Sequence, residues 1–246
     1  MSDEFFVVIP ARYESSRLPG KPLADIGGRP MILRVYDKAV QSAAREVLVA
    51  TDDERIADVC REAGAQVELT SSEHESGTDR IAEVANRRGW DDDDIVVNVQ
   101  GDEPLLPPAL VDQVAALLRD DPDAALATLM TPVRSEEDWR DPNGARVVVD
   151  RNGHALYFSR APIPWPRDGH LPDARRHIGL YAYRVAALRE LAKTPPCDLE
   201  RIEKLEQLRA LWLGMKIAVA VAVEDPPPGV DTQQDLDAVR ARLKGG

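Results

Sequence analysis

The chain has 246 residues, enough for one large α/β domain or for a domain with an additional lobe. Its formal net charge of −12 repels nucleic acid and anionic membranes, so neither is expected as a partner. Cys60 and Cys197 are its only cysteines and lack paired spacing, which argues against zinc and against a disulfide framework. The acidic N-terminus is unlike a signal peptide and the apolar runs are too short to span a bilayer, so we expect a soluble cytoplasmic protein.

Short β-rich runs alternate with helical patterns in the first half of the chain. The expected strands are Phe5–Pro10, Glu46–Thr51, Ala65–Leu69, Ile95–Gln100 and Ala124–Thr131. Apolar residues at helical spacing predict the helices Met31–Ala43, Asp53–Ala63, Gly77–Arg88 and Pro108–Arg119. Thr51 with Glu54, and Ser76 with Asp79, have the spacing of capping boxes. The alternation predicts a three-layer αβα, Rossmann-like fold with a mostly parallel, doubly wound sheet.

After Pro132 the alternation stops, and the sequence predicts a small antiparallel lobe. Arg151-Asn152-Gly153 lies between the strands Ala145–Asp150 and Ala155–Ser159, and Asn-Gly is a strong hairpin signal. With the proline-rich stretch 161–172 and a strand at His177–Arg184, we expect a lobe over residues 133–190, inserted in a single domain 1–246.

The last part of the chain returns to helix and strand. We expect an amphipathic helix Leu199–Leu213 with Asp198 as N-cap, and then a buried strand Ile217–Val223. Thr232 and Asp235 are expected to cap a final helix. The acidic run Asp91–Asp94 is interpreted as a solvated connection between a helix and a strand.

A basic loop follows the first strand directly. Arg12, Arg17 and Lys21 place three cations within ten residues of an otherwise acidic chain, and Gly20 permits close approach of the backbone. Ligands of open α/β sheets bind outside the carboxyl ends of the strands, so this loop is a candidate phosphate site. It is no Walker A loop, because Pro22 stands where Ser or Thr is required. An ordinary charged surface loop is the alternative that composition leaves open.

Two aspartates are candidates for binding a metal. Asp102 follows the strand that ends at Gln100, and Asp231 lies between another strand and a capped helix, so both are expected at the same end of the sheet. Two carboxylates completed by a triphosphate and water suit Mg²⁺. Without further information, a helix start at Asp231 and a loop residue at Asp102 remain the simpler interpretations.

The motifs together resemble the sugar nucleotidyltransferases, and among them the cytidylyltransferases for the acidic eight-carbon sugar 3-deoxy-manno-octulosonate (Kdo). The resemblance covers nearly the whole chain, in the family's order. It rests on Val8–Arg12, Arg17–Leu23, Ser76–Arg80, Val97–Pro104, Tyr157–Arg160, Ile163–Trp165, Leu205–Arg209 and Gly229–Thr232. Two departures bear on sugar selectivity: the stretch 167–176 is short, and Arg201 stands where histidine is common.

The resemblance implies roles for individual residues. The catalytic residues are Arg12, Lys21, Asp102 and Asp231, with Asp102 and Asp231 binding Mg²⁺. The nucleotide site is implied to include Ala11, Arg12, Arg17, Lys21, Thr78 and Arg80, and the sugar site Gln100, Arg160, His177, Tyr181, Glu206 and Gln207. Arg160 suits the substrate carboxylate. From the residues alone, simpler interpretations remain open: Tyr181 could be a core aromatic residue, His177 could lie at a strand edge, and Glu206 could be an exposed charge on a helix.

The implied reaction is transfer of CMP from CTP to the anomeric hydroxyl of Kdo, giving CMP-Kdo for lipopolysaccharide synthesis and releasing pyrophosphate. The family also implies a homodimer, with the lobe helping to form its interface. The alternatives are transfer to another acidic sugar, such as an 8-amino Kdo analogue or a sialic acid, and a nonenzymatic CTP-binding protein. A glycosyltransferase with a similar nucleotide lobe usually needs an Asp-x-Asp metal motif after a strand. Asp91–Asp94 contains that spacing but precedes its strand, so this class is disfavoured.

Overall fold

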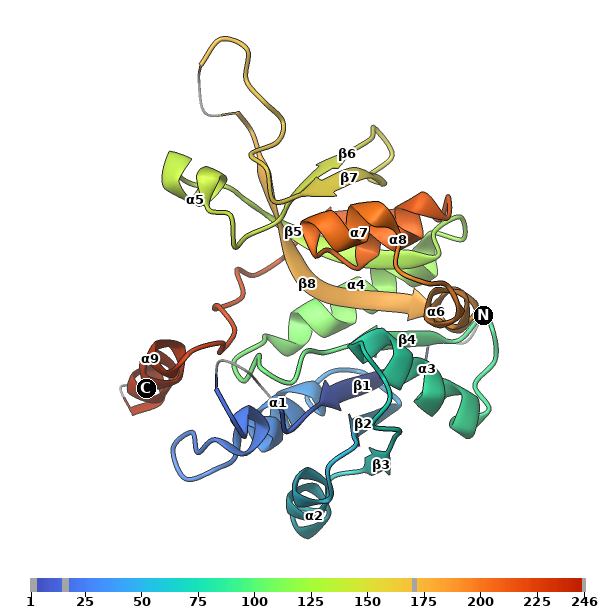
Figure 1. Ribbon diagram of the computed structural model, residues 1–246, viewed down its shortest axis with the longest axis vertical. Helices are drawn as coiled ribbons and strands as arrows, with labels where there is room; N and C mark the ends of the chain where they lie inside the picture. Colours follow the sequence, from blue (N-terminus) through green and yellow to red (C-terminus); the bar gives the residue numbers. More distant parts are fainter. Residues whose placement is uncertain (1–3, 15–17, 170–171, 245–246) are drawn as a thin grey trace.

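The computed structural model describes residues 4–14, 18–169 and 172–244. In this part of the chain one sheet connects nine strands, in the order β3-β2-β1-β4-β8-β5-β9, with β6 and β7 attached to β8 (Figure 1). The strands are β1 Phe5–Ala11, β2 Glu46–Thr51, β3 Val67–Leu69, β4 Ile95–Asn98, β5 Leu126–Pro132, β6 Arg146–Val149, β7 Ala155–Ser159, β8 Arg175–Arg184 and β9 Ile217–Val221. The pairs β1–β2, β1–β4, β2–β3 and β5–β9 are parallel, as the alternation predicts.

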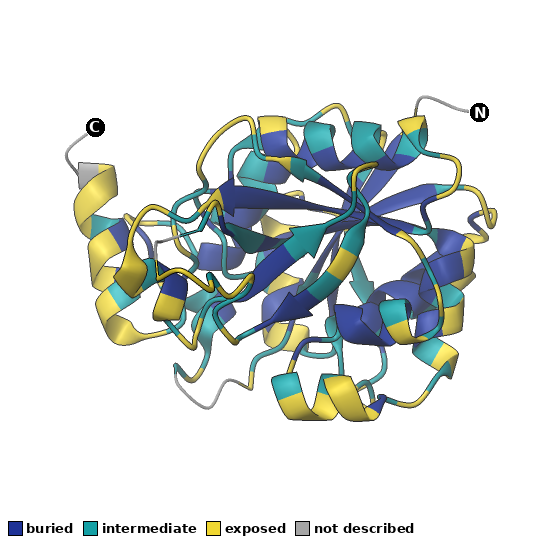
Figure 2. Cartoon of the chain, turned by 90° about the horizontal axis from the view of Figure 1, so that it is seen from above, coloured by how far each residue is buried: buried dark blue, intermediate teal, exposed yellow. Residues whose placement is uncertain are grey.

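Helices cover both faces of the sheet. They are α1 Met31–Ala39, α2 Glu54–Glu62, α3 Gly77–Arg88, α4 Pro108–Asp120, α5 Glu136–Arg140, α6 Val185–Lys193, α7 Asp198–Glu203, α8 Gln207–Trp212 and α9 Gln233–Lys244, with a short 3₁₀ turn, η1, at Lys21–Leu23. Helices α1, α2 and α4 share one core with alternate residues of β1, and α3, α6 and α8 share the other. In Figure 2 the dark blue strands lie between helices whose outer faces are yellow. The three-layer αβα prediction is confirmed.

The side chains of β1 show how one strand supplies two cores. Val7 and Ile9 pack on the side of α1, and Phe6 and Val8 pack on the side of α3. Successive side chains of a strand point to opposite faces, so a central parallel strand needs a continuous apolar run. No described helix is long and apolar enough to cross a membrane.

The strand order reverses beside β1, and this creates the crevice in which the site lies. From β1 the chain winds to β2 and β3 on one side, and β4 then pairs with the other side of β1. The loops after β1 and β4 are therefore neighbours at the carboxyl edge. Gly101 makes their contact possible, because a Cβ there would lie 2.9 Å from the carbonyl oxygen of Pro10. The sequence predicted this edge as the ligand site.

Strand β8 corrects the expected division of the chain. Residues 177–184 were predicted to belong to the antiparallel lobe, but β8 runs through the main sheet, antiparallel to both β4 and β5. Its side chains from Ile178 to Tyr183 supply both cores. Because it is apolar on both faces, this strand is buried inside the main sheet, although the sequence around it belongs to the lobe. The predicted hairpin is confirmed: β6 pairs antiparallel with β7, and β6 also pairs with the first residues of β8.

The predicted helix Leu199–Leu213 is wrong. The structure has two short helices, α7 and α8, separated at Lys204, whose φ of 54° is left-handed. Asp198 is the first residue of α7 rather than its N-cap, which is Cys197. The capping box at Ser76 and Asp79 is confirmed, but α2 is capped by the side chain of Asp53, not by Thr51.

The last helix lies beside α1 (Figure 1). A small third core joins Leu236 and Val239 of α9 to Ile26, Met31 and Val230. Thr232 and Asp235 exchange hydrogen bonds at the start of α9, as predicted. This packing fixes the loop that carries Asp231.

Candidate active site

The first part of the site is a cavity of about 320 Å³ at the carboxyl ends of β1 and β4. Its lining joins three stretches distant in the sequence: the loop after β1, the Gln100–Asp102 loop after β4, and Asp231. The lining residues are Pro10, Ala11, Arg12, Glu14, Lys21, Pro22, Gln100, Gly101, Asp102 and Asp231. Five of the predicted catalytic or nucleotide-side residues therefore meet here: Ala11, Arg12, Lys21, Asp102 and Asp231. Arg17 lies outside the described residues.

Lys21 joins the two aspartates. Its Nζ donates to Asp102 Oδ2 at 2.7 Å, to Asp231 Oδ1 at 3.2 Å and to the carbonyl oxygen of Val230 at 3.1 Å. Gly20 has a φ of 68°, a conformation that favours glycine, and it begins the turn that presents Lys21. The two carboxylates therefore converge on a single cationic atom, although the sequence separates them widely.

Arg12 and Arg80 hold neighbouring loops. Arg12 donates to the carbonyl oxygen of His74, which connects the basic loop to the segment before α3. Arg80 is fully buried, ion-paired with Asp52 at 3.1 Å and hydrogen-bonded to Thr70. Its guanidinium therefore supports the segment that follows β3. Thr78, predicted on the nucleotide side, lines the second cavity instead.

The second cavity, of about 550 Å³, adjoins the first and shares Gln100 with it. All six predicted sugar-site residues line it: Gln100, Arg160, His177, Tyr181, Glu206 and Gln207. Three buried polar atoms along its walls have no hydrogen-bond partner among the described residues, namely Asn98 Oδ1, Tyr181 OH and Gln207 Nε2. Buried polar atoms are normally paired, so this cavity suits a ligand with many hydroxyl groups.

His177 is held on three sides. Its ring packs edge-on against Phe158 and tilted against Tyr181, with centroid distances of 5.0 and 5.2 Å. Its Nε2 lies 3.0 Å from Thr128 Oγ1. Burial lowers the pKa of His177 to about 3, so the imidazole is neutral at physiological pH. It therefore presents a neutral hydrogen-bonding group at the wall of the cavity.

The break between α7 and α8 brings Glu206 and Gln207 into the same cavity. Glu206 is the N-cap residue of α8 and Gln207 its first helical residue. Thr78 donates a hydrogen bond to Glu206 Oε1, and burial raises the pKa of this carboxyl. In a continuous helix these neighbours would point about 100° apart.

Arg160 is engaged mainly with main-chain carbonyls. Its Nε donates to Glu203 O at 2.7 Å, and Nη1 to Pro142 O at 3.3 Å and Asn143 O at 2.8 Å. Nη2 donates to Lys204 O at 3.4 Å. A guanidinium has about five N–H groups, so roughly one is left for the cavity and a bidentate contact would require one of these bonds to be released.

Sequence reasoning missed several residues of the second cavity. Arg176 and Lys204 line it as further cations, and Asn143 and Gly144 form part of its rim. Arg176 directly precedes His177 on β8 and lines the same cavity. The Asn143-Gly144 turn signal could have indicated the rim, but no local pattern shows which lobe arginine faces a ligand.

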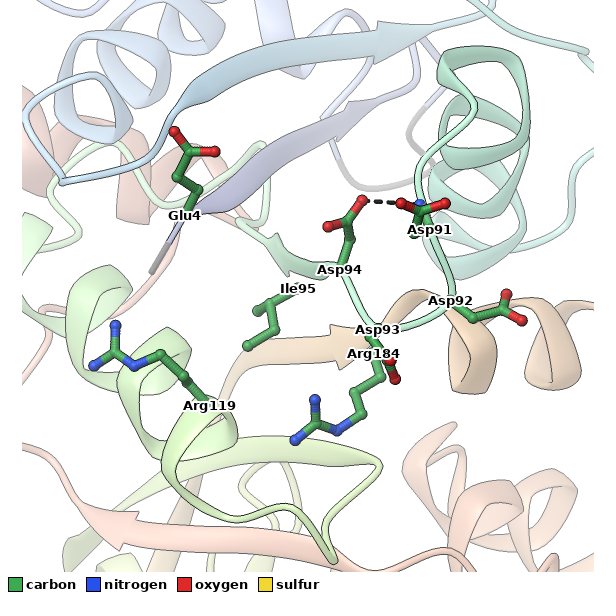
Figure 3. Close-up of a pocket in the computed structure, with 8 residues that line it drawn as sticks. All are labelled: Glu4, Asp91, Asp92, Asp93, Asp94, Ile95, Arg119 and Arg184. Atoms are coloured by element: carbon green, nitrogen blue, oxygen red, sulfur yellow. Dashed lines mark hydrogen bonds between the residues drawn. The ribbon is translucent and has the colours of Figure 1, made fainter. Parts of the chain in front are cut away.

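The acidic run Asp91–Asp94 lies at the opposite edge of the sheet, before β4. It lines a cavity of about 420 Å³ together with Glu4, Ile95, Arg119 and Arg184 (Figure 3). Asp91 N donates to Asp94 Oδ2 at 2.8 Å, which closes the turn. Its predicted role as a connection between helix and strand is confirmed.

The crevice at the strand reversal, with a cationic loop facing two aspartates, is suited to the phosphates of a nucleotide. The family model for cytidylyltransferases matches residues 6–217, and the chain belongs to this family. A curated relative from Halorhodospira halophila is 55% identical over 98% of this chain and 97% of its own length; it is named 3-deoxy-manno-octulosonate cytidylyltransferase. A relative from Pseudomonas syringae pv. syringae with the same name is 52% identical over the full length of both chains.

Solved structures agree with this assignment. A CMP:2-keto-3-deoxy-manno-octonic acid synthetase complexed with CTP superposes with a TM-score of 0.92 and is 43% identical, covering 98% of this chain and 99% of its own. A cytidylyltransferase from Leptospira borgpetersenii is 15% identical with a TM-score of 0.66, covering all of this chain and 88% of its own. The second likeness concerns the fold alone.

Proposed function

We propose that the protein transfers CMP from CTP to the anomeric hydroxyl of Kdo and supplies CMP-Kdo for lipopolysaccharide synthesis. The observation that carries the proposal is the pair of adjoining cavities that share Gln100. One holds a cationic loop and two aspartates, and the other is lined by polar and cationic groups. A triphosphate in the first places its α-phosphorus next to an acidic sugar in the second.

The reaction follows from this arrangement. The anomeric hydroxyl gives up its proton, its oxygen forms a bond to the α-phosphorus, and the bond to the pyrophosphate oxygen breaks. Negative charge then grows on the leaving pyrophosphate. Arg12 and Lys21 line the cavity where that charge develops, and preorganised cations there stabilise the transition state more than the ground state. The shared wall at Gln100 orients the two reactants for in-line attack.

Asp102 and Asp231 are the residues that would hold Mg²⁺. Their carboxylates both contact Lys21 Nζ, so they already converge on one cation, and their side chains are 31% and 47% exposed. This donor set suits Mg²⁺, which takes few carboxylates and completes its shell with water and phosphate. When bound, the ion neutralises charge on the phosphates. With a triphosphate in the cavity, Lys21 is free to exchange the aspartates for a phosphate oxygen.

We assign the substrate carboxylate to the cationic wall of the second cavity. Arg160, Arg176 and Lys204 lie there, and the remaining N–H of Arg160 is available to one carboxylate oxygen. The other walls carry the unpaired groups of Asn98, Tyr181 and Gln207, which match sugar hydroxyls. An acidic, polyhydroxylated substrate fits both features.

We further propose a cytoplasmic homodimer. Leu156 on β7 is 62% exposed, and Trp165 is 65% exposed although it stacks on Trp139. Large exposed apolar side chains in the hairpin region favour a surface covered by a partner. Light scattering over a range of protein concentrations tests this; a monomer mass throughout would contradict it.

The test of function is a substrate panel. The protein is incubated with Mg²⁺, each of four nucleoside triphosphates and a set of acidic sugars, and pyrophosphate release is measured. We expect turnover with CTP and Kdo. Comparable turnover with ATP or GTP would overturn the cytidine assignment, and preference for a sialic acid would overturn the sugar assignment. If the protein bound CTP but released no pyrophosphate with any of the sugars, only the alternative of a nonenzymatic CTP-binding protein would remain.

A further inference from the structure

An irregularity in the sheet lies directly behind the second cavity. Thr128 of β5 pairs with Tyr181 of β8, but the next residue, Leu129, pairs with Ile178. Gly179 and Leu180 are thus extra residues on β8, and such a bulge re-aims the neighbouring side chains. The bulge keeps His177 and Tyr181 close, with ring centroids 5.2 Å apart, although four positions separate them.

The hydroxyl of Thr128 closes this bulge. Thr128 is fully buried, and its Oγ1 lies 3.0 Å from the carbonyl oxygen of Ile178 and 2.8 Å from that of Leu180. The same oxygen lies 3.0 Å from His177 Nε2. One side chain therefore contacts both the distorted backbone and the imidazole that the distortion presents.

The hydrogen-bond inventory indicates which nitrogen of His177 carries the proton. A hydroxyl has one proton, and carbonyl oxygens only accept. If Thr128 gave that proton to His177, its oxygen would face both carbonyl oxygens without a proton between them, so donation to Ile178 or Leu180 is the favoured arrangement. Toward His177 it can then act only as an acceptor, which requires a proton on Nε2. A neutral imidazole with Nε2–H has a lone pair on Nδ1. Nδ1 makes no hydrogen bond with the described residues, and His177 lines the cavity.

We infer that Thr128 is a positioning residue that fixes the ring and tautomer of His177, so that Nδ1 accepts a hydrogen bond from a hydroxyl of the acidic sugar. This role rests on the proposed function for its ligand. The assignment of the tautomer rests on the contacts of Thr128 alone. The other walls of the cavity supply Arg160 and Arg176 as donors, so an acceptor at His177 complements them for a polyhydroxylated substrate.

The matched variants are Thr128→Val, which keeps the shape and removes the hydroxyl, and Thr128→Ser, which keeps the hydroxyl. We expect Thr128→Val to raise the KM for Kdo by roughly three- to tenfold, the effect of one neutral hydrogen bond, and to leave the KM for CTP within about twofold. Thr128→Ser should restore the KM for Kdo to near that of the unaltered protein. In a His177→Phe background, Thr128→Val should add no further change to that KM, because the proposed role acts only through the imidazole.

A spectroscopic readout separates this inference from the proposed function. ¹⁵N chemical shifts of His177 should show Nε2 protonated and Nδ1 unprotonated in the unaltered protein and in Thr128→Ser, and a mixture of tautomers in Thr128→Val. Protonated Nδ1 in the unaltered protein, an unchanged KM for Kdo in Thr128→Val, or equal changes in both KM values would overturn the positioning role. Failure of the unaltered protein to use Kdo, with the Nε2–H tautomer present, would instead overturn the choice of sugar.

Discussion

A buried ion pair holds together the helices that carry the sugar-side residues, and removing one partner should show how much of the site depends on it. Arg209 of α8 contacts Glu200 of α7 through two hydrogen bonds, Nε to Oε2 at 2.8 Å and Nη2 to Oε1 at 2.5 Å. Its Nη1 donates to the carbonyl oxygens of Leu191 and Thr194, both at 2.9 Å. The side chains are 6% and 12% exposed. One guanidinium thus joins α7 and α8 to the end of α6.

The substitution Arg209→Met removes the charge and every donor while filling similar space. It leaves the Glu200 carboxylate buried without its counter-ion, and breaking a buried pair in this way typically costs about 3–5 kcal/mol. For a chain of this size that loss corresponds to a fall in Tm of roughly 10 °C. Gln207 lies at the start of α8 and lines the cavity, so the KM for the sugar should also rise.

The control lies on α7, the helix that carries Glu200. Arg201 of α7 contacts Asp198 at 3.1 Å, but the side chains are 57% and 91% exposed, so Arg201→Met should change the free energy of unfolding by less than about 0.5 kcal/mol. The double variant Arg209→Met with Glu200→Leu removes both charges and should recover much of the loss. Urea unfolding measures all four proteins. A loss below about 1 kcal/mol in Arg209→Met, or no recovery in the double variant, would refute the reasoning.

Three further predictions concern the two cavities. Asp102→Asn and Asp231→Asn should fold normally but lose on the order of 10²-fold or more in kcat, and near-normal rates at saturating Mg²⁺ would contradict the metal role. Arg160→Lys should raise the KM for the sugar with little effect on that for CTP, and Arg12→Lys should do the reverse; steady-state kinetics in both substrates decide this. His177, with its pKa lowered from 6.5 to about 3, binds more protons when unfolded, so stability falls as pH drops below 6.5. His177→Gln should remove about 1–2 kcal/mol of that fall by about pH 5 in denaturation curves. Parallel curves for the two proteins would exclude a lowered pKa at His177.

The regular part of the fold could be predicted because each element obeys a local rule. The apolar runs predicted β1 and β2, and the capping box of Ser76 and Asp79 predicted the start of α3. The structure places all three as expected. The convergence of Asp102 and Asp231 also followed, since the carboxyl ends of parallel strands meet at one edge. On the nucleotide side, local periodicity and sheet topology are therefore sufficient to predict most of the arrangement of the site.

The sugar side could not be predicted to the same degree, because two departures from local rules create it. The sequence from Leu199 to Leu213 has a helical pattern without glycine or proline near Lys204, yet the helix breaks there. The bulge opposite Thr128 likewise depends on contacts between distant strands. Tertiary contacts decide both, so propensity and spacing give no warning.

Under the proposed function, these departures place the residues that contact the sugar apart from those that contact CTP. The break at Lys204 presents Glu206 and Gln207, and the bulge presents His177, whereas the phosphate cavity is built at the ends of regular parallel strands. Gln100 is the lining residue common to both described cavities. A change in the break or the bulge can therefore re-shape the wall that meets the sugar and leave Lys21, Asp102 and Asp231 in contact with one another. Sugar selectivity should accordingly depend on residues near these two irregularities, whereas the KM for CTP should depend on residues of the loops after β1 and β4.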